Sequence, residues 1–570
     1  MITGKSLNSK EGEESMKNKM ISRMIAVILA GCMILSTAGC GNNATVSNNE
    51  TSEVTKTSEK EESAVTEKSE EEFTYPMDTD VKLSLWSQNA ETLAACYSSY
   101  EESPYHLGLA ENTGIDIEWI FPDTSAGEEA VFNLMLTDKE LPDMFVTNTY
   151  YNSVAELEAL MDGGVILDLT DLIPKYAPNY WAYLNEPGHE YRLKSSTTED
   201  GRLFGVQSFR DEYCTCYTGP VIRQDWLDAC GLNTPVTMEQ FEEVLRTFHE
   251  EYDAVLTFRP TRVRGYGFAS GTGAYTGFIL GYYLDENGKV QCANLQPEWK
   301  EYLETLHRWY EEGLLDPEFA TMDDATVRSK IMDGKVGMTF TAMSQLTAFI
   351  GDAETAGTGA VFAGLGYPRV AEGEPTSIIF AGSTAVGTFA LLNAKLSEEE
   401  VIAALRWCDY GFTDEGNMYK NFGTLGESYV LDENGEPTFT ELVTADPDGV
   451  SEALMKYTGT SGSAIAGIQS EEHVKMKNSE VTAEAVYTWV ENTKAFDAML
   501  PTLNHTEEEA IKYSDLVAPL DTYIEQMALK YITGEEDFAG YDEFMKTLTE
   551  MGIQETIDIN QAAYDRFMNR

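Results

Sequence analysis

The side chains that could act as nucleophiles or metal ligands are few and widely spaced. Among the eight cysteines, Cys214-Thr-Cys216 is too tightly spaced for the usual zinc pair, and no two of the six histidines have the spacing of metal ligands. The motifs GxxxxGK[ST], HExxH and GxSxG are absent, and Asp446-Pro-Asp448-Gly lacks the later glutamate of a calcium loop. The sequence therefore indicates no cofactor, no metal site and no recognisable catalytic set.

Carboxylates are the exception, because they are abundant. The 570 residues include 96 Asp and Glu, and the net charge is −57. A pair of carboxylates that hydrolyses glycosides could be hidden among them, so a secreted enzyme stays open as an alternative. The charge argues against nucleic acid and against anionic lipid head groups as partners.

One cysteine thiol is predicted to be modified. Lys17, Lys19 and Arg23 precede the apolar run Met24–Leu35, which ends in Ser-Thr-Ala-Gly-Cys40, and this order is typical of a secretory signal. The end of the run resembles a bacterial lipobox, in which the cysteine is acylated. Cys32 is the alternative acceptor, a transmembrane anchor is the alternative structure, and Met16 is an alternative start.

The segment after Cys40 is predicted to be a tether. Asn42–Glu72 is rich in Ser, Thr, Asn, Glu and Lys, and such a composition buries too little apolar surface to fold. Roughly 500 residues remain, which favours two domains over one core. The remaining cysteines have irregular spacing that favours free thiols over disulfides.

Strands and helices alternate in the first part of the chain. Asp80–Trp86, Ile115–Phe121 and Leu141–Thr147 are predicted strands, and Val154–Met161 has helical spacing. This order indicates an α/β domain with a largely parallel sheet. Later segments predict strands at Leu203–Phe209, Lys335–Phe340 and Thr384–Phe389, a capped helix from Thr237, and a helical C-terminus.

Several stretches together resemble the extracellular solute-binding proteins of bacterial ABC importers, in the LplA-like oligosaccharide-binding group (family 1). They are Leu141-Pro-Asp143, the run Gly164–Asn179 (GVILDLTDLIPKYAPN), Asp200–Gly205 (DGRLFG), Ile222–Leu232 (IRQDWLDACGL), Gly313–Phe319 (GLLDPEF), Gly423–Tyr429 and Ala562–Phe567. Gln207-Ser208 departs from the pattern, because relatives often have a proline there.

The resemblance implies a two-lobed α/β fold of the periplasmic-binding-protein type II, with a ligand cleft between the lobes and a helical C-terminus. The composition and the turn signals of the sequence change near Phe209–Asp211 and near Ala381–Thr384. Both segments place Gly, Ser or flexible polar residues beside short strands, as hinges need. The expected organisation is a signal peptide (1–39), a tether (40–75), lobe 1 (76–209), lobe 2 (210–381), a return to lobe 1 (382–440), and the completion of lobe 2 with the C-terminal helices (441–570).

The resemblance also implies the function, which is to capture a carbohydrate, an oligosaccharide, by hinge closure and deliver it to the permease. The expected protein is no enzyme, and it is monomeric and lipid-anchored on the extracellular face of the cell membrane. The alternatives are a lipid-anchored polysaccharide-acting enzyme or a surface adhesin.

Sugars need aromatic platforms for their C–H faces and polar groups for their hydroxyls, both placed where strands end. The candidate ligand contacts are Trp86, Gln88, Asn89, Asn148, Tyr150, Tyr151, Arg210, Tyr213, Tyr275, Phe340, Thr341, Met343, Ser383, Asn421, Glu427 and Tyr429.

Overall fold

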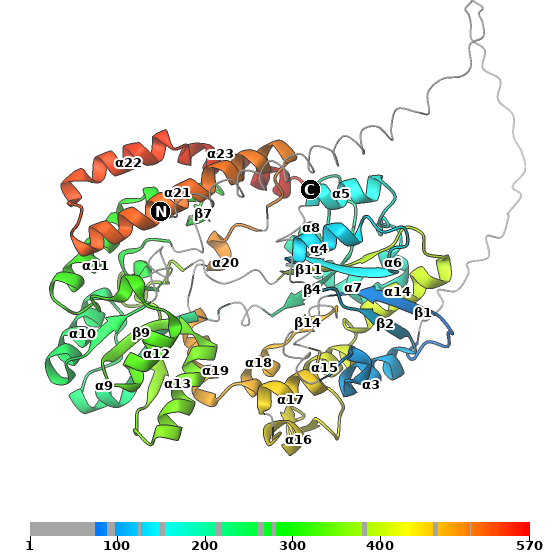
Figure 1. Ribbon diagram of the computed structural model, residues 1–570, viewed down its shortest axis with the longest axis horizontal. Helices are drawn as coiled ribbons and strands as arrows, with labels where there is room; N and C mark the ends of the chain where they lie inside the picture. The colour runs from blue at the N-terminus through cyan, green and yellow to red at the C-terminus, as the bar shows by residue number, and fades with distance from the viewer. Residues whose placement is uncertain are drawn as a thin grey trace, which may run out of the picture. The chain divides into compact units, whose positions relative to one another are not determined.

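The computed structural model confirms the α/β class, and it contains two main sheets with helices on both (Figure 1). Phe73–Arg570 form one compact unit. The structure describes residues 74–87, 97–123, 127–148, 154–188, 190–211, 216, 218–258, 267–275, 281–378, 385–447, 449–459, 466–491, 493, 495–501 and 503–570.

The first sheet has six strands in the order β14-β4-β11-β3-β1-β2. β1 lies parallel to β2 and to β3, as the alternation of strands and helices along the chain predicted. β11 is antiparallel to its neighbours β3 and β4. The strands are β1 (Lys82–Trp86), β2 (Asp116–Ile120), β3 (Met144–Asn148), β4 (Val206–Arg210), β11 (Ala385–Leu392) and β14 (Ile468–Gln469).

Alternation of side chains decides which face of this sheet is buried. Leu83 and Leu85 of β1 are fully buried and join a cluster with residues of the neighbouring helices, whereas Ser84 faces the other way and accepts a hydrogen bond from the Asp143 backbone N–H at 3.0 Å. The helices nearest these strands are α3 (Pro104–Thr113), α4 (Glu128–Met135), α5 (Val154–Asp162) and α14 (Glu398–Tyr410).

The second sheet has four strands in the order β10-β5-β9-β6. The predicted capping box forms, because the Thr237 side chain accepts from Gln240 N–H and the Gln240 side chain accepts from the Thr237 N–H. The strands are β5 (Thr218–Arg223), β6 (Val255–Thr257), β9 (Val336–Ala342) and β10 (Phe362–Gly364). The helices are α9 (Gln224–Cys230), α10 (Met238–Tyr252), α11 (Pro297–Glu311), α12 (Asp324–Met332) and α13 (Met343–Ala356).

The chain passes between the two sheets three times, and these passages are called the first, second and third crossings. β4 leads into β5, β10 leads back to β11, and β14 leads to α18 (Glu471–Lys477) and α19 (Glu480–Val490), which packs on β5 and β10. β14 belongs to the first sheet although it follows residue 440, where the predicted return to lobe 1 ends. The lobe boundaries themselves stay a prediction.

The C-terminus is helical, as predicted, and consists of α21 (Glu507–Thr533), α22 (Tyr541–Glu550) and α23 (Ile553–Met568). α21 packs on α11 of the second sheet and on α23 (Figure 1). Arg566 of α23 bonds Glu199, which lies just before β4, at 2.8 Å. The C-terminal helices therefore add a contact between the regions of the two sheets.

Shorter elements complete the fold. The strands β7 (Tyr282–Leu284) and β8 (Val290–Cys292) form a hairpin, and β12 (Tyr429–Leu431) and β13 (Pro437–Phe439) form a second one. The remaining helices are α6 (Ile173–Tyr176), α7 (Pro178–Leu184), α8 (Glu190–Ser195), α15 (Asp414–Phe422), α16 (Glu441–Thr444), α17 (Val450–Tyr457) and α20 (Ala495–Ala498), with short 3-10 turns such as η1 (Tyr100–Glu102) and η5 (Gly267–Thr272).

A buried polar network fixes the first described residues to α14. The Tyr75 hydroxyl donates to the Arg406 carbonyl at 2.7 Å, and the Arg406 guanidinium lies over the Tyr75 ring. Arg406 Nη1 also donates to Asp409 Oδ2 at 2.9 Å, and that carboxylate accepts from Asn179 and from the Tyr180 N–H. Tyr75, the last residue of the predicted tether (40–75), is thereby docked on the first sheet's helices.

Cysteines 216, 230, 292 and 408 are free thiols, which confirms the prediction for these four. Burial raises the pKa of the Cys292 thiol to about 12, so it stays protonated and unreactive.

Gly219 of β5 lies against the indole of Trp489, so a methyl group there would overlap the ring. We expect Gly219→Ala to lower the free energy of unfolding by about 1–3 kcal/mol, because the packed core cannot move aside without strain. Gly351 of α13 is the matched control, since nothing lies within 4 Å of its added Cβ. Gly351→Ala should instead stabilise by about 0.5–1 kcal/mol. Urea unfolding of both variants measures this, and equal values would contradict the packing argument.

Candidate functional site

The carboxyl ends of three strands meet at one edge of the six-stranded sheet. Trp86 pairs with Phe145, Asn148 pairs with Thr388, and Phe209 pairs with Ala385. β1, β3 and β4 therefore end where β11 begins. In α/β sheets, ligand contacts are found beyond such strand ends. The predicted residues 88, 89, 150, 151, 213 and 383 occupy the chain positions directly after these ends or before β11.

One edge of the four-stranded sheet is linked to this edge by the crossings. β5 begins at Thr218, which pairs with Ala342 at the end of β9, and β6 ends at Thr257 beside Thr339. Only residues 211–217 separate Arg210 at the end of β4 from Thr218. The crossings thus connect the strand ends of the two sheets at which the predicted ligand contacts lie. We call this region the strand-end junction, and it is the candidate site.

Arg210 lies at the first crossing, as predicted. Its backbone pairs with Gln469 of β14, and its Nε is buried with no hydrogen-bond partner. Buried donors in proteins are almost always paired, so an open guanidinium N–H is a candidate ligand contact. Arginine also presents several donors in a fixed plane, which suits neighbouring hydroxyl oxygens.

Asp211 connects the first crossing to the third. Its carboxylate accepts from the Glu471 N–H at 2.9 Å, and its own N–H donates to the Gln469 carbonyl at 3.0 Å. Burial raises the pKa of Asp211, with smaller contributions from nearby carboxylates, while the hydrogen bond from Glu471 lowers it. The sequence analysis missed this residue, and its position in a short segment between two strands was the available signal.

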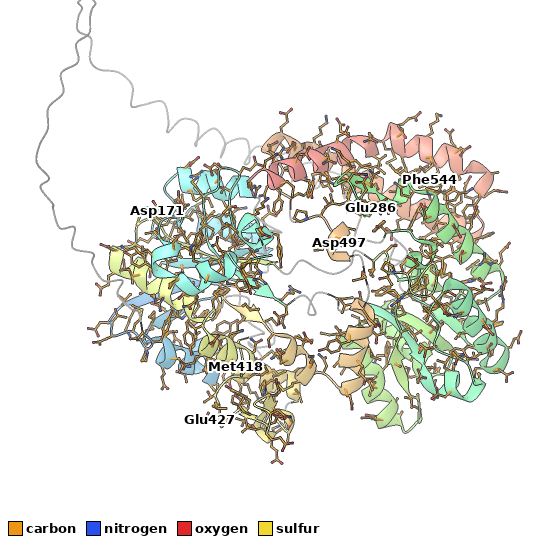
Figure 2. All side chains as sticks on the ribbon, turned by 180° about the vertical axis from the view of Figure 1, so that it is seen from behind. Asp171, Glu286, Met418, Glu427, Asp497 and Phe544 are labelled. Carbon is orange, nitrogen blue, oxygen red and sulfur yellow. The ribbon has the colours of Figure 1, made fainter. Side chains whose placement is uncertain are left out.

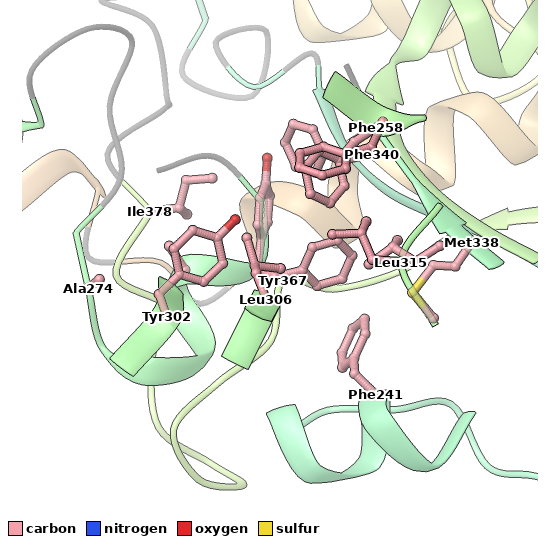
Figure 3. Packing of buried hydrophobic residues seen from close by; sticks show 14 of the residues in the cluster. Phe241, Phe258, Ala274, Tyr302, Leu306, Leu315, Met338, Phe340, Tyr367 and Ile378 are labelled. Atoms are coloured by element: carbon pink, nitrogen blue, oxygen red, sulfur yellow. The ribbon is translucent and has the colours of Figure 1, made fainter. Parts of the chain in front are cut away.

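Phe340, Thr341 and Met343 lie at the end of β9 and the start of α13. Phe340 is 4% exposed and packs among the core rings near Phe258 and Tyr367 (Figure 3). Thr341 is buried and pairs with Gly219, while Met343 is half-buried. In this conformation the Phe340 ring therefore has no free face, and its role as a platform stays a prediction.

Trp86 ends β1, as predicted, but its ring is 5% exposed and packs edge-on against Phe132 of α4, with ring centroids 5.8 Å apart. It belongs to the core cluster under α4 and α5. A stacking role for Trp86 also stays a prediction.

Tyr275 is stacked on Tyr283, with ring centroids 4.0 Å apart and planes 13° from parallel. Burial raises the pKa of Tyr275, with smaller contributions from Glu286 and Asp497, and Figure 2 shows these two carboxylates in the same region. Tyr275 is half-buried, so this pair combines aromatic surface with nearby acceptors.

Asn421 is 1% exposed, and its amide is fully used. It donates to the Ile468 carbonyl at 2.9 Å and accepts from the Ser470 N–H at 2.9 Å, which fixes β14 in place. Tyr429 is buried in a small cluster with Phe422. Glu427 is exposed at the outer part of this segment (Figure 2). The structure gives Asn421 and Tyr429 positional roles, and it leaves Glu427 away from the strand-end junction.

The remaining predicted contacts cannot be placed. The residues Gln88, Asn89, Tyr150, Tyr151, Tyr213, Ser383 and the predicted lipidation site Cys40 lie outside the described residues. Asn148 is described only by its backbone at the end of β3.

Two threonines that the sequence analysis did not select carry open hydroxyls near the crossings. Thr218 begins β5, and Thr376 lies in the segment between β10 and β11; the Oγ1 of each is buried without a hydrogen-bond partner. Hydroxyls both donate and accept, so they could bond a polar ligand. A threonine beside a strand end gives no distinctive sequence signal.

Within the described ranges, no group of three or more His, Cys, Asp or Glu side chains is placed to hold a metal ion. The same part of the chain has no helix with the length and apolar character needed to cross a membrane.

Comparison with protein families gives one match that spans more than half of the chain. The family described as bacterial extracellular solute-binding protein matches residues 104–418. This range includes the whole second sheet, β2, β3, β4 and β11 of the first sheet, and the first two crossings, while β1 and β14 lie outside it.

Similar proteins match over most of their length. Lipoprotein LipO of Bacillus subtilis (strain 168) is 23% identical over 482 residues, 81% of this chain and 89% of LipO. The fructooligosaccharide ABC transporter substrate-binding protein FusA of Streptococcus pneumoniae serotype 4 is 23% identical over 500 residues, 80% of this chain and 86% of FusA. FusA in complex with kestose has a TM-score of 0.59 at 18% identity, covering 86% of this chain and 100% of that chain.

A further solved structure supports the same fold. The HMO-binding, ABC-transporter-associated solute-binding protein of Bifidobacterium longum infantis ATCC 15697 has a TM-score of 0.66 at 19% identity, covering 86% of this chain and 99% of that chain. At this identity the likeness shows the fold alone.

Proposed function

The chain belongs to the bacterial extracellular solute-binding proteins, a non-enzymatic family of ABC transporters, and on this premise we propose that it captures a neutral oligosaccharide. Family membership sets aside the alternative of an enzyme. The observation that carries the location of the site is Arg210, whose buried Nε has no partner at the crossing between the two sheets.

Two observations support an oligosaccharide as the ligand. FusA and the B. longum infantis protein, both similar over most of this chain, are described as binding sugars or HMO. The candidate site also offers groups that suit hydroxyls, namely the Arg210 guanidinium and the hydroxyls of Thr218 and Thr376.

The charge of the protein favours a neutral sugar over an acidic one. The net charge is −57, so a polyanionic chain such as a uronate polymer would be repelled during its approach. A neutral oligosaccharide does not meet this barrier.

The proposed mechanism is closure about the three crossings. The two sheets act as the centres of two lobes, and the ligand contacts residues from both only in the closed state, which shifts the population toward closure. Asp211 ties two of the crossings together through its bonds to Glu471 and Gln469, so it would make them bend as one unit.

The proposed location is the extracellular face of the membrane, with Cys40 acylated and the permease subunits as partners. The tether 42–72 would keep the protein near its permease and raise their effective concentration.

Isothermal titration with kestose, maltotriose and an oligogalacturonate tests the proposal. We expect one neutral sugar to bind and to raise the thermal midpoint, with a stabilisation of about 2.7 kcal/mol when the ligand reaches 100 times its Kd. The oligogalacturonate should bind least well. Turnover of any sugar, or tighter binding of the acidic one, would contradict the proposal.

Arg210→Ala should weaken the binding of that sugar by about 10- to 100-fold, because a hydrogen bond from a charged donor contributes about 1.5–3 kcal/mol. Arg246 is the matched control, because it lies on α10 and pairs with Glu312 at the surface. Arg246→Ala should leave the Kd unchanged. Equal affinities for the Arg210→Ala variant and the unmodified protein would remove Arg210 from the site.

A further inference from the structure

A cavity of about 640 Å³ lies on the first sheet, away from the junction of the crossings. Its lining includes Lys82 and Asp116, which begin β1 and β2, whereas the candidate site lies where strands end. α3 contributes His106, and α14 contributes Trp407. The volume is within the range of small-molecule sites, which is about 300–1,000 Å³.

Two side chains that line this cavity have buried polar atoms without partners. His106 is 7% exposed, and neither of its ring nitrogens has a hydrogen bond. The indole N–H of Trp407 is also buried and unpaired. More than nine in ten buried polar groups in proteins are hydrogen-bonded, so two such residues in one cavity point to a missing partner.

Packing alone does not account for a histidine at position 106. Its ring is stacked on Tyr100 with centroids 4.3 Å apart, and it meets Tyr105 and Trp119 edge-on. A phenylalanine would make the same ring contacts without desolvating two polar atoms. What histidine adds is therefore its two nitrogens.

The protonation state of the His106 ring determines which of its two nitrogens can donate and which can accept a hydrogen bond. Burial lowers the pKa of His106 to about 3, so the ring is neutral at physiological pH. A neutral imidazole has one donor and one acceptor, and the Trp407 indole is a donor only. The missing partner must both accept and donate, as a hydroxyl does.

The remaining lining excludes anions and favours an uncharged ligand. Glu101, Glu118, Asp116 and Asp143 all line the cavity, while Lys82 is its one cation in the described lining and is paired with Asp116 at 2.9 Å. The half-buried indole of Trp119 adds an aromatic surface. Exposed carboxylates such as Glu101 and Glu118 accept hydrogen bonds from hydroxyl groups.

From these features together we propose that the cavity between β1, β2, α3 and α14 is a second carbohydrate site, which binds one neutral pyranose unit. A sugar ring places hydroxyls on His106 and Trp407 and its C–H face on Trp119. The site is separate from the crossings, so it would hold a sugar whether or not the two lobes close.

The test is fluorine NMR of the full chain labelled with 5-fluorotryptophan, titrated with methyl β-glucoside, methyl β-galactoside and N-acetylglucosamine to millimolar concentrations. At least one sugar should shift the Trp119 and Trp407 signals saturably, once these are assigned by Trp→Phe variants. The Trp181 signal, from another cavity, is the internal control and should stay fixed. No saturable shift with any of the three sugars would overturn the proposal.

His106→Phe should abolish the shift while the protein stays folded, and a shift that persists in this variant would also overturn the proposal. If this variant does not fold, Glu118→Ala replaces it; Glu118 is exposed, and its loss should weaken the same binding about fivefold. Arg210→Ala should leave the shift intact, so that failure of the second site and failure of the proposed oligosaccharide site give different results.

Discussion

Asp409→Ala is expected to lower the free energy of unfolding by about 3–5 kcal/mol, because it leaves a buried charge without its partner. Arg406 is 1% exposed, and Asp409 is fully buried. The variant also leaves the Asn179 amide and the Tyr180 N–H without their acceptor.

Two controls separate this effect from a general sensitivity to losing carboxylates. Asp116→Ala removes the exposed ion pair with Lys82 and should cost about 0–1 kcal/mol. The double variant Arg406→Met with Asp409→Leu should recover much of the loss, because both charges leave together. Urea unfolding measures all three. A loss below about 1 kcal/mol for Asp409→Ala would show that water or another group takes over the role of its carboxylate.

His106→Phe is expected to stabilise the protein, which is unusual for a buried substitution. At neutral pH the gain should be about 1–3 kcal/mol, because two buried polar atoms without partners disappear while the ring contacts stay. His307 is the matched control, since its Nδ1 lies 3.1 Å from the Ile532 carbonyl. His307→Phe should destabilise, because it removes a hydrogen bond that is made.

The advantage of His106→Phe should grow as the pH falls. Burial holds the pKa of His106 at about 3 in the folded protein, whereas the unfolded chain has about 6.5. Between pH 6.5 and pH 3, His106 binds a proton in the unfolded state and remains neutral in the folded state. The unmodified protein therefore loses stability as the pH falls through this range. The variant lacks the group.

The difference in unfolding free energy between the two proteins should therefore increase by about 1.4 kcal/mol for each pH unit below 6.5, and level off near pH 3. Other titrating groups are shared by both proteins and cancel in the difference. Urea unfolding at several pH values between 7 and 4 measures it. A difference that does not change with pH would mean that the pKa of His106 in the folded protein equals its value in the unfolded chain, and it would contradict the prediction.

Local patterns were sufficient to predict the α/β class and many of its strands and helices, whereas the two-lobed arrangement was implied by the family resemblance. The alternation in Asp80–Trp86 and Ile115–Phe121 predicted β1 and β2 because each strand buries one face, and period-two patterning follows directly from strand geometry. The capping box at Thr237 and the helical spacing near the C-terminus were equally local signals. β14 was missed, since a two-residue strand has no period of its own and exists through pairing with β4.

The candidate site was harder to predict, because burial depends on contacts distant in sequence. Arg210 was placed at a crossing by its position after a predicted strand. Trp86 and Phe340 have the same kind of position, yet the first packs under α4 and the second packs against Tyr367, which is 27 residues later in the chain. Asn421 was chosen as a polar residue near glycines, and only the fold shows that β14 uses its amide. His106 gave no signal, because an isolated histidine in a helix is unremarkable in sequence.

The docking of Tyr75 on Arg406 has a mechanical consequence for the proposed transport cycle. If the tether is anchored at the membrane, any pull on it reaches the protein at α14 and therefore loads the first sheet's side. The second sheet would then move about the three crossings, while the first sheet keeps a fixed orientation relative to the anchored tether. On the surface that meets the permease, the part formed by the first sheet would thus keep a constant orientation. Only the part formed by the second sheet would change position when ligand binds.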